Sequence, residues 1–144
     1  MKHTLVLGYG NELRRDDGIG PYVAREVDAW GFPGVIGLAV HQLTPELAAE
    51  LSCVNRAIFV DASAIGESVQ VAEISPSDPK SPSAHAGDPS KLLGLAKQVY
   101  GRCPKAWLIT VPAHDMDFGE GFSIEGRRGA DEALEAVKRM MNAE

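Results

Sequence analysis

The sequence has few cysteines, no long apolar segment and no excess of basic residues. Its two cysteines, Cys53 and Cys103, lie far apart and outside any CxxC or Cys/His spacing, which argues against a disulfide framework or a structural zinc site. No apolar run approaches the roughly 20 residues of a membrane-spanning helix. Lys and Arg number 14 against 20 Asp and Glu, and the resulting net charge of -6 argues against nucleic-acid binding and against a polybasic membrane-surface module.

Several sequence patterns of known enzyme classes are also missing. The chain has neither the HExxH helix of a zinc protease nor the G-x-S-x-G turn of a serine hydrolase. Gly8 and Gly10 resemble the start of a dinucleotide-binding fingerprint, but Leu13 stands where that pattern needs a glycine. The N-terminal residues also lack the long apolar stretch of a signal peptide, so we expect a cytoplasmic protein.

Apolar runs alternate with helical patterns along the chain. Five strands are expected, at residues 4–7, 35–40, 57–60, 69–74 and 107–111. Four helices are expected, at residues 20–30, after a cap at Thr44, after Asp88-Pro89, and at 129–141. Four of the strands are the continuous runs of a buried parallel sheet, whereas 69–74 alternates as an edge strand does. We therefore expect one domain, residues 1–144, with an α/β fold in which helices cover both faces of a mostly parallel sheet.

Acidic and imidazole side chains fall where the predicted strands end. Asp16 and Asp17 follow the turn after the first strand, Asp61 directly follows the third, and His85 lies in a Pro- and Ser-rich loop before a helix. Because sites in open α/β sheets gather at the carboxyl ends of the strands, these side chains can come together. Two carboxylates and one imidazole would then form a divalent-metal site or a general acid/base set.

Other roles remain open for these residue types. An aspartate near a strand end often only caps a helix, and a lone loop histidine is often only solvated. His114, after the fifth strand, is a reserve ligand, and His41, at the end of the second strand, is a candidate for the rim of the site. Cys53 falls in a helical, apolar context and is expected to pack in the core.

Four short motifs resemble those of one known family. The opening LVLGYGN, continued by Leu13 and by DDGIG at 16–20, resembles the N-terminal signature of the hydrogenase maturation proteases. Three further blocks follow in that family's order: FVDA at 59–62, SAHAGDP at 83–89 and FGEGFS at 118–123. The resemblance covers almost the whole chain. These endopeptidases trim the C-terminal extension from the large-subunit precursor of nickel–iron hydrogenases.

The resemblance implies a three-layer sandwich with a twisted five-stranded sheet, and a trio of Asp17, Asp61 and His85 that serves as metal site and catalytic site. The metal would be nickel already inserted in the precursor, and zinc or cadmium could occupy the site in vitro. Many members carry Glu in place of Asp17, which leaves the choice between Asp16 and Asp17 as ligand open. Residues around the trio are expected to contact the precursor: Gly8, Gly10, Asn11, Asp16 and His41.

The chemistry of peptide hydrolysis leaves two mechanisms open. A divalent ion held by the trio could polarise the scissile carbonyl or lower the pKa of a bound water. Alternatively, one aspartate could be the general base while the metal only docks the substrate. The same metal site would also suit a non-catalytic nickel-sensing chaperone of the precursor. A small-molecule α/β hydrolase is the third possibility, and it would need a deep apolar pocket. We expect the hydrogenase precursor as partner, and neither nucleic acid nor a membrane.

Overall fold

A single five-stranded sheet forms the centre of the molecule. The computed structural model describes residues 3–78 and 88–143. Neighbouring strands pair in parallel, except that the edge strand β4 runs antiparallel to β5. The mostly parallel sheet and the edge position of the fourth strand are therefore confirmed. The strands follow the order β2-β1-β3-β5-β4 and comprise β1 (Thr4–Tyr9), β2 (Val35–Val40), β3 (Arg56–Ser63), β4 (Gln70–Ile74) and β5 (Lys105–Pro112).

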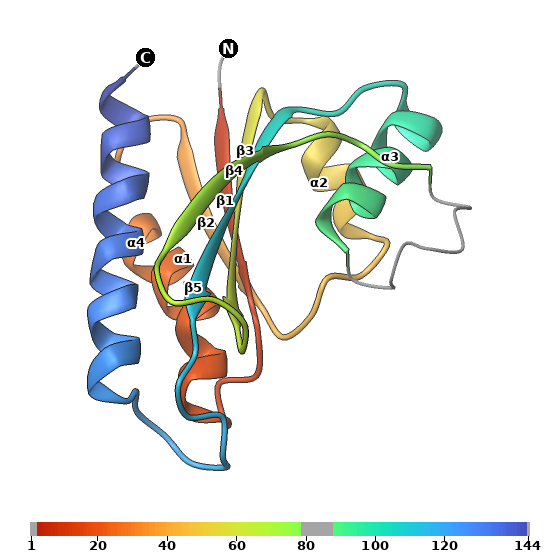
Figure 1. The fold of residues 1–144 in the computed structure, drawn as a ribbon. Coiled ribbons are helices and arrows are strands. Elements are labelled where there is room, and N and C mark those ends of the chain that lie inside the picture. Colours follow the sequence, from red (N-terminus) through yellow and green to blue (C-terminus); the bar gives the residue numbers. More distant parts are fainter. Residues whose placement is uncertain (1–2, 79–87, 144) are drawn as a thin grey trace.

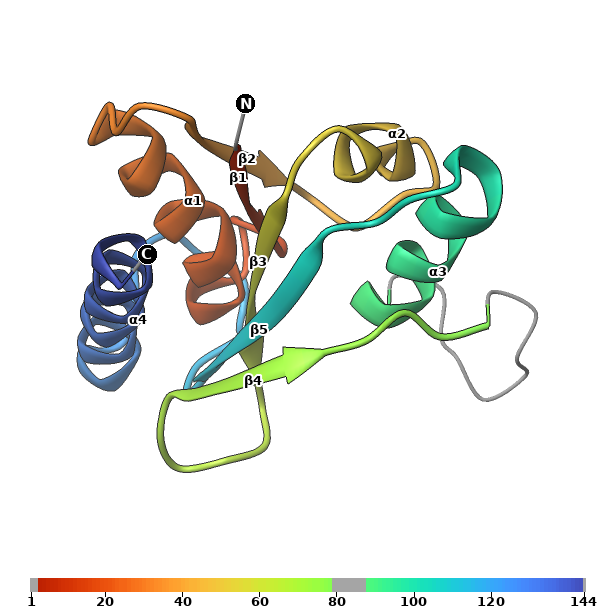
Figure 2. The same cartoon turned by 90° about the horizontal axis from the view of Figure 1, so that it is seen from above.

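Helices cover both faces of this sheet, which confirms the three-layer sandwich. Helices α1 and α4 lie on one face, and α2 and α3 lie on the other (Figures 1 and 2). Within the described residues, none of the helices combines the length and apolar character needed to cross a membrane. The helical elements are the 3-10 turn η1 (Arg15–Gly18), α1 (Ile19–Ala29), α2 (Leu47–Ser52), α3 (Pro89–Tyr100) and α4 (Ile124–Asn142).

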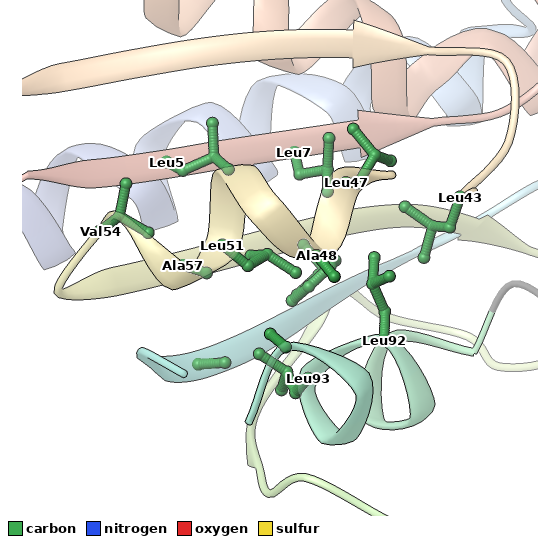
Figure 3. Close-up of a cluster of buried hydrophobic side chains, with 13 residues drawn as sticks. Leu5, Leu7, Leu43, Leu47, Ala48, Leu51, Val54, Ala57, Leu92 and Leu93 are labelled. Atoms are coloured by element: carbon green, nitrogen blue, oxygen red, sulfur yellow. The ribbon is translucent and has the colours of Figure 1, made fainter. Parts of the chain in front are cut away.

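The alternation of side chains along the strands assigns each residue to one of two apolar cores. Leu5, Leu7 and Phe59 pack against α2 and α3 (Figure 3), whereas Val6 and Ile58 pack against α1 and α4. The same alternation continues to the carboxyl ends of the strands. Tyr9 of β1 and Asp61 of β3 therefore belong to the α2/α3 face.

Close packing of α1 on the sheet fixes the start of the chain's first loop. A Cβ at Gly20 would lie 2.6 Å from the carbonyl oxygen of Val60, and a Cβ at Gly8 would clash with the carbonyl oxygen of Gly20. Only glycine allows this approach of helix and strand. Gly8, one of the predicted substrate contacts, is buried in this structure, where it allows the close approach of α1.

Local details differ from the sequence predictions at three places. Helix α4 begins at Ile124 rather than at 129, because the Ser123 hydroxyl accepts a hydrogen bond from the amide of Gly126 and caps the helix there. Thr44 provides no side-chain cap, since α2 begins through backbone hydrogen bonds such as that from Leu47 to the Thr44 carbonyl. Cys53 is exposed rather than packed in the core. The helix expected after Asp88-Pro89 is confirmed, and the Asp88 side chain caps it by accepting a hydrogen bond from the Ser90 amide.

Candidate functional site

Asp17 and Asp61 come together at the carboxyl edge of the sheet. Asp61 lies near the end of β3, and Asp17 lies on η1, which follows β1, the strand next to β3. The carboxylate of Asp17 accepts a hydrogen bond of 2.7 Å from the amide of Asn11, which fixes its orientation. The two carboxylates are close enough for the charge of Asp17 to raise the pKa of Asp61. Two of the three predicted trio members thus form one acidic pair.

The surroundings of Asp61 make its carboxyl group a proton acceptor near neutral pH. Burial is the main cause and the charge of Asp17 the next, and together they raise the pKa of Asp61 to about 6. Hydrogen bonds from the Tyr9 hydroxyl and the Ala62 amide stabilise the charged form and limit this rise. A carboxylate with such a pKa can exchange a proton with water at physiological pH, as a general base does.

Tyr9 is a site residue that the sequence analysis missed. Its hydroxyl donates a hydrogen bond to Asp61, and burial followed by the nearby Asp61 charge raises the pKa of Tyr9, so it stays protonated as a donor. Asp88, the N-cap of α3, adds to this effect and so also faces the site. The alternation of β1 could have identified Tyr9, since it continues the face of Leu5 and Leu7 to the strand end where Asp61 lies.

Asp16 has a different environment from its neighbour Asp17. It is fully buried, and its two carboxylate oxygens accept four hydrogen bonds of 2.7 to 3.1 Å, from the amides of His114, Asp115 and Ser123 and from the Ser123 hydroxyl. Burial alone would raise the pKa of Asp16, but these hydrogen bonds outweigh it and lower the pKa. In this structure the acceptors of Asp16 are occupied inside the protein, whereas the carboxylate of Asp17 lies beside Asp61.

Hydrogen bonds around Asp16 join two loops into one unit. The amide of Gly119 donates to the carbonyl oxygen of Leu13, and the amide of Arg15 donates to the carbonyl oxygen of Gly119. The Arg14 side chain adds a bond of 3.0 Å from its Nε to the carbonyl oxygen of Met116. The segment between β5 and α4 thereby braces the segment that carries Asp17.

The predicted substrate contacts Gly10, Asn11 and His41 lie together, beside the acidic pair. With Leu13 they line a groove of about 400 Å³ at the carboxyl ends of β1 and β2. His41 is exposed there, directly after the last residue of β2. The groove adjoins the site, because the amide of Asn11 holds the Asp17 carboxylate. These three residues can therefore contact a substrate that reaches Asp17.

The third member of the predicted trio, His85, lies outside the described residues. Across residues 3–78 and 88–143, no group of three His, Cys, Asp or Glu side chains is arranged to hold a metal. The reserve ligand His114 borders a different hollow, together with Glu67 and Glu125. The described part of the site thus offers carboxylate oxygens only, a donor set that does not by itself select nickel.

Comparisons with known proteins find similar folds among solved structures. No family model matches the chain, and no curated protein matches it in sequence. Among solved structures, the chain is similar to the hydrogenase maturating endopeptidase HybD from E. coli, with a TM-score of 0.79 and 21% identity over 98% of this chain and 93% of that one. It is also similar to the [NiFe] hydrogenase maturation protease HycI from Thermococcus kodakarensis, with a TM-score of 0.76 and 19% identity over 98% and 93% of the two chains.

A third similar structure is the hydrogenase 2 maturation peptidase from a Thaumarchaeota archaeon, with a TM-score of 0.73 and 21% identity over 99% of this chain and 100% of that one. At these identities the likeness establishes a shared fold. The resemblance seen in the sequence is therefore confirmed at the level of the fold, along nearly the full length of each chain.

Replacing Asp16 with Asn should destabilise the protein. The amide group of Asn would face backbone donors that now bond to a carboxylate oxygen, so we expect the free energy of unfolding to fall by about 2–4 kcal/mol. Urea denaturation at pH 7 measures this. The control is Asp115→Asn, whose partly exposed side chain forms an ion pair with Arg15 and should contribute little. Equal stabilities of the two variants would contradict the role assigned to Asp16.

Replacing Asp61 with Asn should stabilise the metal-free protein above pH 6. The folded protein holds a proton on Asp61 up to pH about 6, whereas the unfolded chain releases it near its ordinary value of 3.8. The free energy of unfolding of the wild type therefore falls as the pH rises from 3.8 to about 6, whereas that of the variant does not, because its side chain carries no titrating proton. We expect a gain of up to about 3 kcal/mol at pH 8 and well under about 1 kcal/mol at pH 4, by urea denaturation at both values. A variant less stable than wild type at pH 8 would contradict this.

Proposed function

We propose that this protein is an endopeptidase that removes the C-terminal extension of a nickel–iron hydrogenase large-subunit precursor after nickel insertion. The observation that carries the proposal is the pairing of Asp17 with Asp61 at the carboxyl edge of the sheet. The shared fold of structures described as hydrogenase maturation proteases supports it.

The electrostatics of the acidic pair favour a cation as part of what it binds. The charge of Asp17 raises the pKa of Asp61, which shows that the two carboxylates repel each other, and a divalent ion between them removes this repulsion. In the proposal, nickel arrives inside the precursor and contacts Asp17 and Asp61, with His85 as third ligand. Three ligands from this protein leave other coordination positions of the metal open, as is needed if the substrate supplies most of the metal's ligands.

The hydrolytic step needs a general base, and Asp61 is given this role through the carboxylate oxygen that does not contact the metal. A water molecule attacks the scissile carbonyl carbon while Asp61 accepts the water's proton. The C–N bond then breaks, and the proton passes to the leaving amine nitrogen. Tyr9 stabilises the Asp61 carboxylate through its hydroxyl, and Asn11 keeps Asp17 turned towards the groove in which the precursor would lie.

Single substitutions of the acidic pair test this function. We expect Asp17→Asn and Asp61→Asn each to lower the cleavage rate of a nickel-loaded precursor by about 100-fold or more, because each removes a charge that contacts the reacting site. Mass spectrometry of the precursor's C-terminus measures cleavage. The matched control is Asp131→Asn, an exposed carboxylate on α4 that should leave the rate unchanged.

Binding of the same precursor, measured in parallel, separates the protease from a chaperone. A protease loses cleavage in both variants, whereas a non-catalytic nickel-sensing chaperone shows no cleavage even as wild type and loses only complex formation. Unchanged cleavage by both variants would contradict the roles given to Asp17 and Asp61.

A further inference from the structure

Four strongly exposed apolar side chains gather at the same edge of the molecule as the acidic pair. Ile65, Phe118, Ile124 and Leu13 expose 85%, 81%, 78% and 62% of their surface, more than any other large apolar residue of the described chain. The remaining large exposed apolar residues are between 46% and 61% exposed. Scattered apolar residues are normal on a protein surface, so their concentration at one edge is the informative feature.

The position of these residues follows from the topology. Leu13 follows β1, Ile65 follows β3, Phe118 follows β5, and Ile124 is the first residue of α4, which the same β5 loop leads into. All four therefore lie in segments at the carboxyl ends of parallel strands, the lower end of the sheet in Figure 1. We call Leu13, Ile65, Phe118 and Ile124 the apolar collar. Leu13 also lines the groove next to Asp17, so the collar meets the candidate site at this residue.

Each collar residue is presented from a fixed backbone. The amide of Leu13 donates to Asn11 Oδ1 at 2.9 Å, and its carbonyl oxygen accepts from Gly119, the residue after Phe118. The amide of Ile65 donates to the Ser63 hydroxyl at 3.1 Å. Ile124 follows Ser123, which the buried Asp16 holds through two hydrogen bonds.

A fixed backbone matters because ordering loops and side chains is one of the main free-energy costs of association. Large apolar side chains often anchor a protein–protein interface, and they lose less conformational freedom on binding when their backbone is already fixed. Apolar contacts around a polar centre also exclude water from it, and this strengthens electrostatic interactions of the acidic pair with a bound cation.

We propose that the apolar collar is the docking surface for the folded body of the protein substrate, separate from the Asp17/Asp61 pair that acts on the scissile bond. This inference rests on the proposed function. A short peptide would occupy only the groove, whereas apolar residues on three separate segments at this edge require a partner with a broad surface. Leu13 belongs both to the collar and to the groove beside Asp17, so a protein substrate held in the groove would also meet the collar.

The test compares two double variants at exposed apolar residues. Ile65→Ser with Phe118→Ser removes half of the collar and leaves the groove residue Leu13 in place, and Val99→Ser with Tyr100→Ser removes exposed apolar groups at the end of α3. Initial cleavage rates over a range of nickel-loaded precursor concentrations give kcat and KM for each. We expect the collar variant to raise KM by at least about tenfold with little change in kcat, since docking contacts are lost equally from ground state and transition state.

The control variant should stay within about twofold of wild-type KM, and thermal unfolding should confirm that both variants remain folded. Equal KM values for the two variants would overturn the proposal. If the collar variant instead dissociates a wild-type dimer in sedimentation and leaves KM unchanged, the collar is a contact between copies of this chain and the proposal is overturned as well.

Failure of the collar can be told apart from failure of the proposed function. If wild type cleaves nothing, the dissociation constant of the precursor complex replaces KM as the readout. A collar variant that binds at least about tenfold more weakly than wild type then supports the docking surface although the protease function fails. Equal dissociation constants, or no binding by wild type, overturn the docking surface.

Discussion

The buried carboxylate of Asp16 is the interaction on which the site depends. It collects donors from the start of the β5–α4 loop and from the helix cap that ends this loop, while its own backbone lies in the turn after β1. Removing a charged group from water is costly, and four hydrogen bonds offset that cost. Gly126 is part of the same constraint, because a side chain there would clash with the Asp16 carboxylate. The two loops consequently form one rigid frame at the edge of the sheet.

That frame allows two adjacent aspartates to serve opposite purposes. Asp16 turns towards the start of α4 and holds the structure together, whereas Asp17 is only partly buried and lies near Asp61, on the side of Tyr9 and α3. The carboxylates of Asp17 and Asp61 repel each other, and this repulsion is relieved only when a proton or a cation binds. The stabilising hydrogen bonds of Asp16 thus lie on one side of the turn, and the carboxylates proposed for catalysis lie on the other.

The fold could be predicted from the sequence because four of its strands contain short apolar runs, and because 69–74 alternates as an edge strand does. The start of α4 was placed too late, since Gly126 and Gly129 weaken the helical pattern although Ser123 caps it. Asp17 and Asp61 could be identified from their positions at strand ends. The separate role of Asp16 could not, because it depends on donors about a hundred residues away in the chain. The face on which Tyr9 lies could be predicted from the alternation of β1, but its hydrogen bond to Asp61 depends also on the pairing of β1 with β3.

The most direct test of the account is a cleavage assay on two forms of one substrate. The purified protein is mixed with the nickel-loaded hydrogenase large-subunit precursor and, separately, with the metal-free precursor, and mass spectrometry detects loss of the C-terminal extension. The account predicts cleavage of the loaded form only, because the acidic pair requires the substrate's cation to engage the scissile segment. Equal cleavage of both forms would contradict metal recognition by Asp17 and Asp61, and cleavage of neither would contradict the protease function itself.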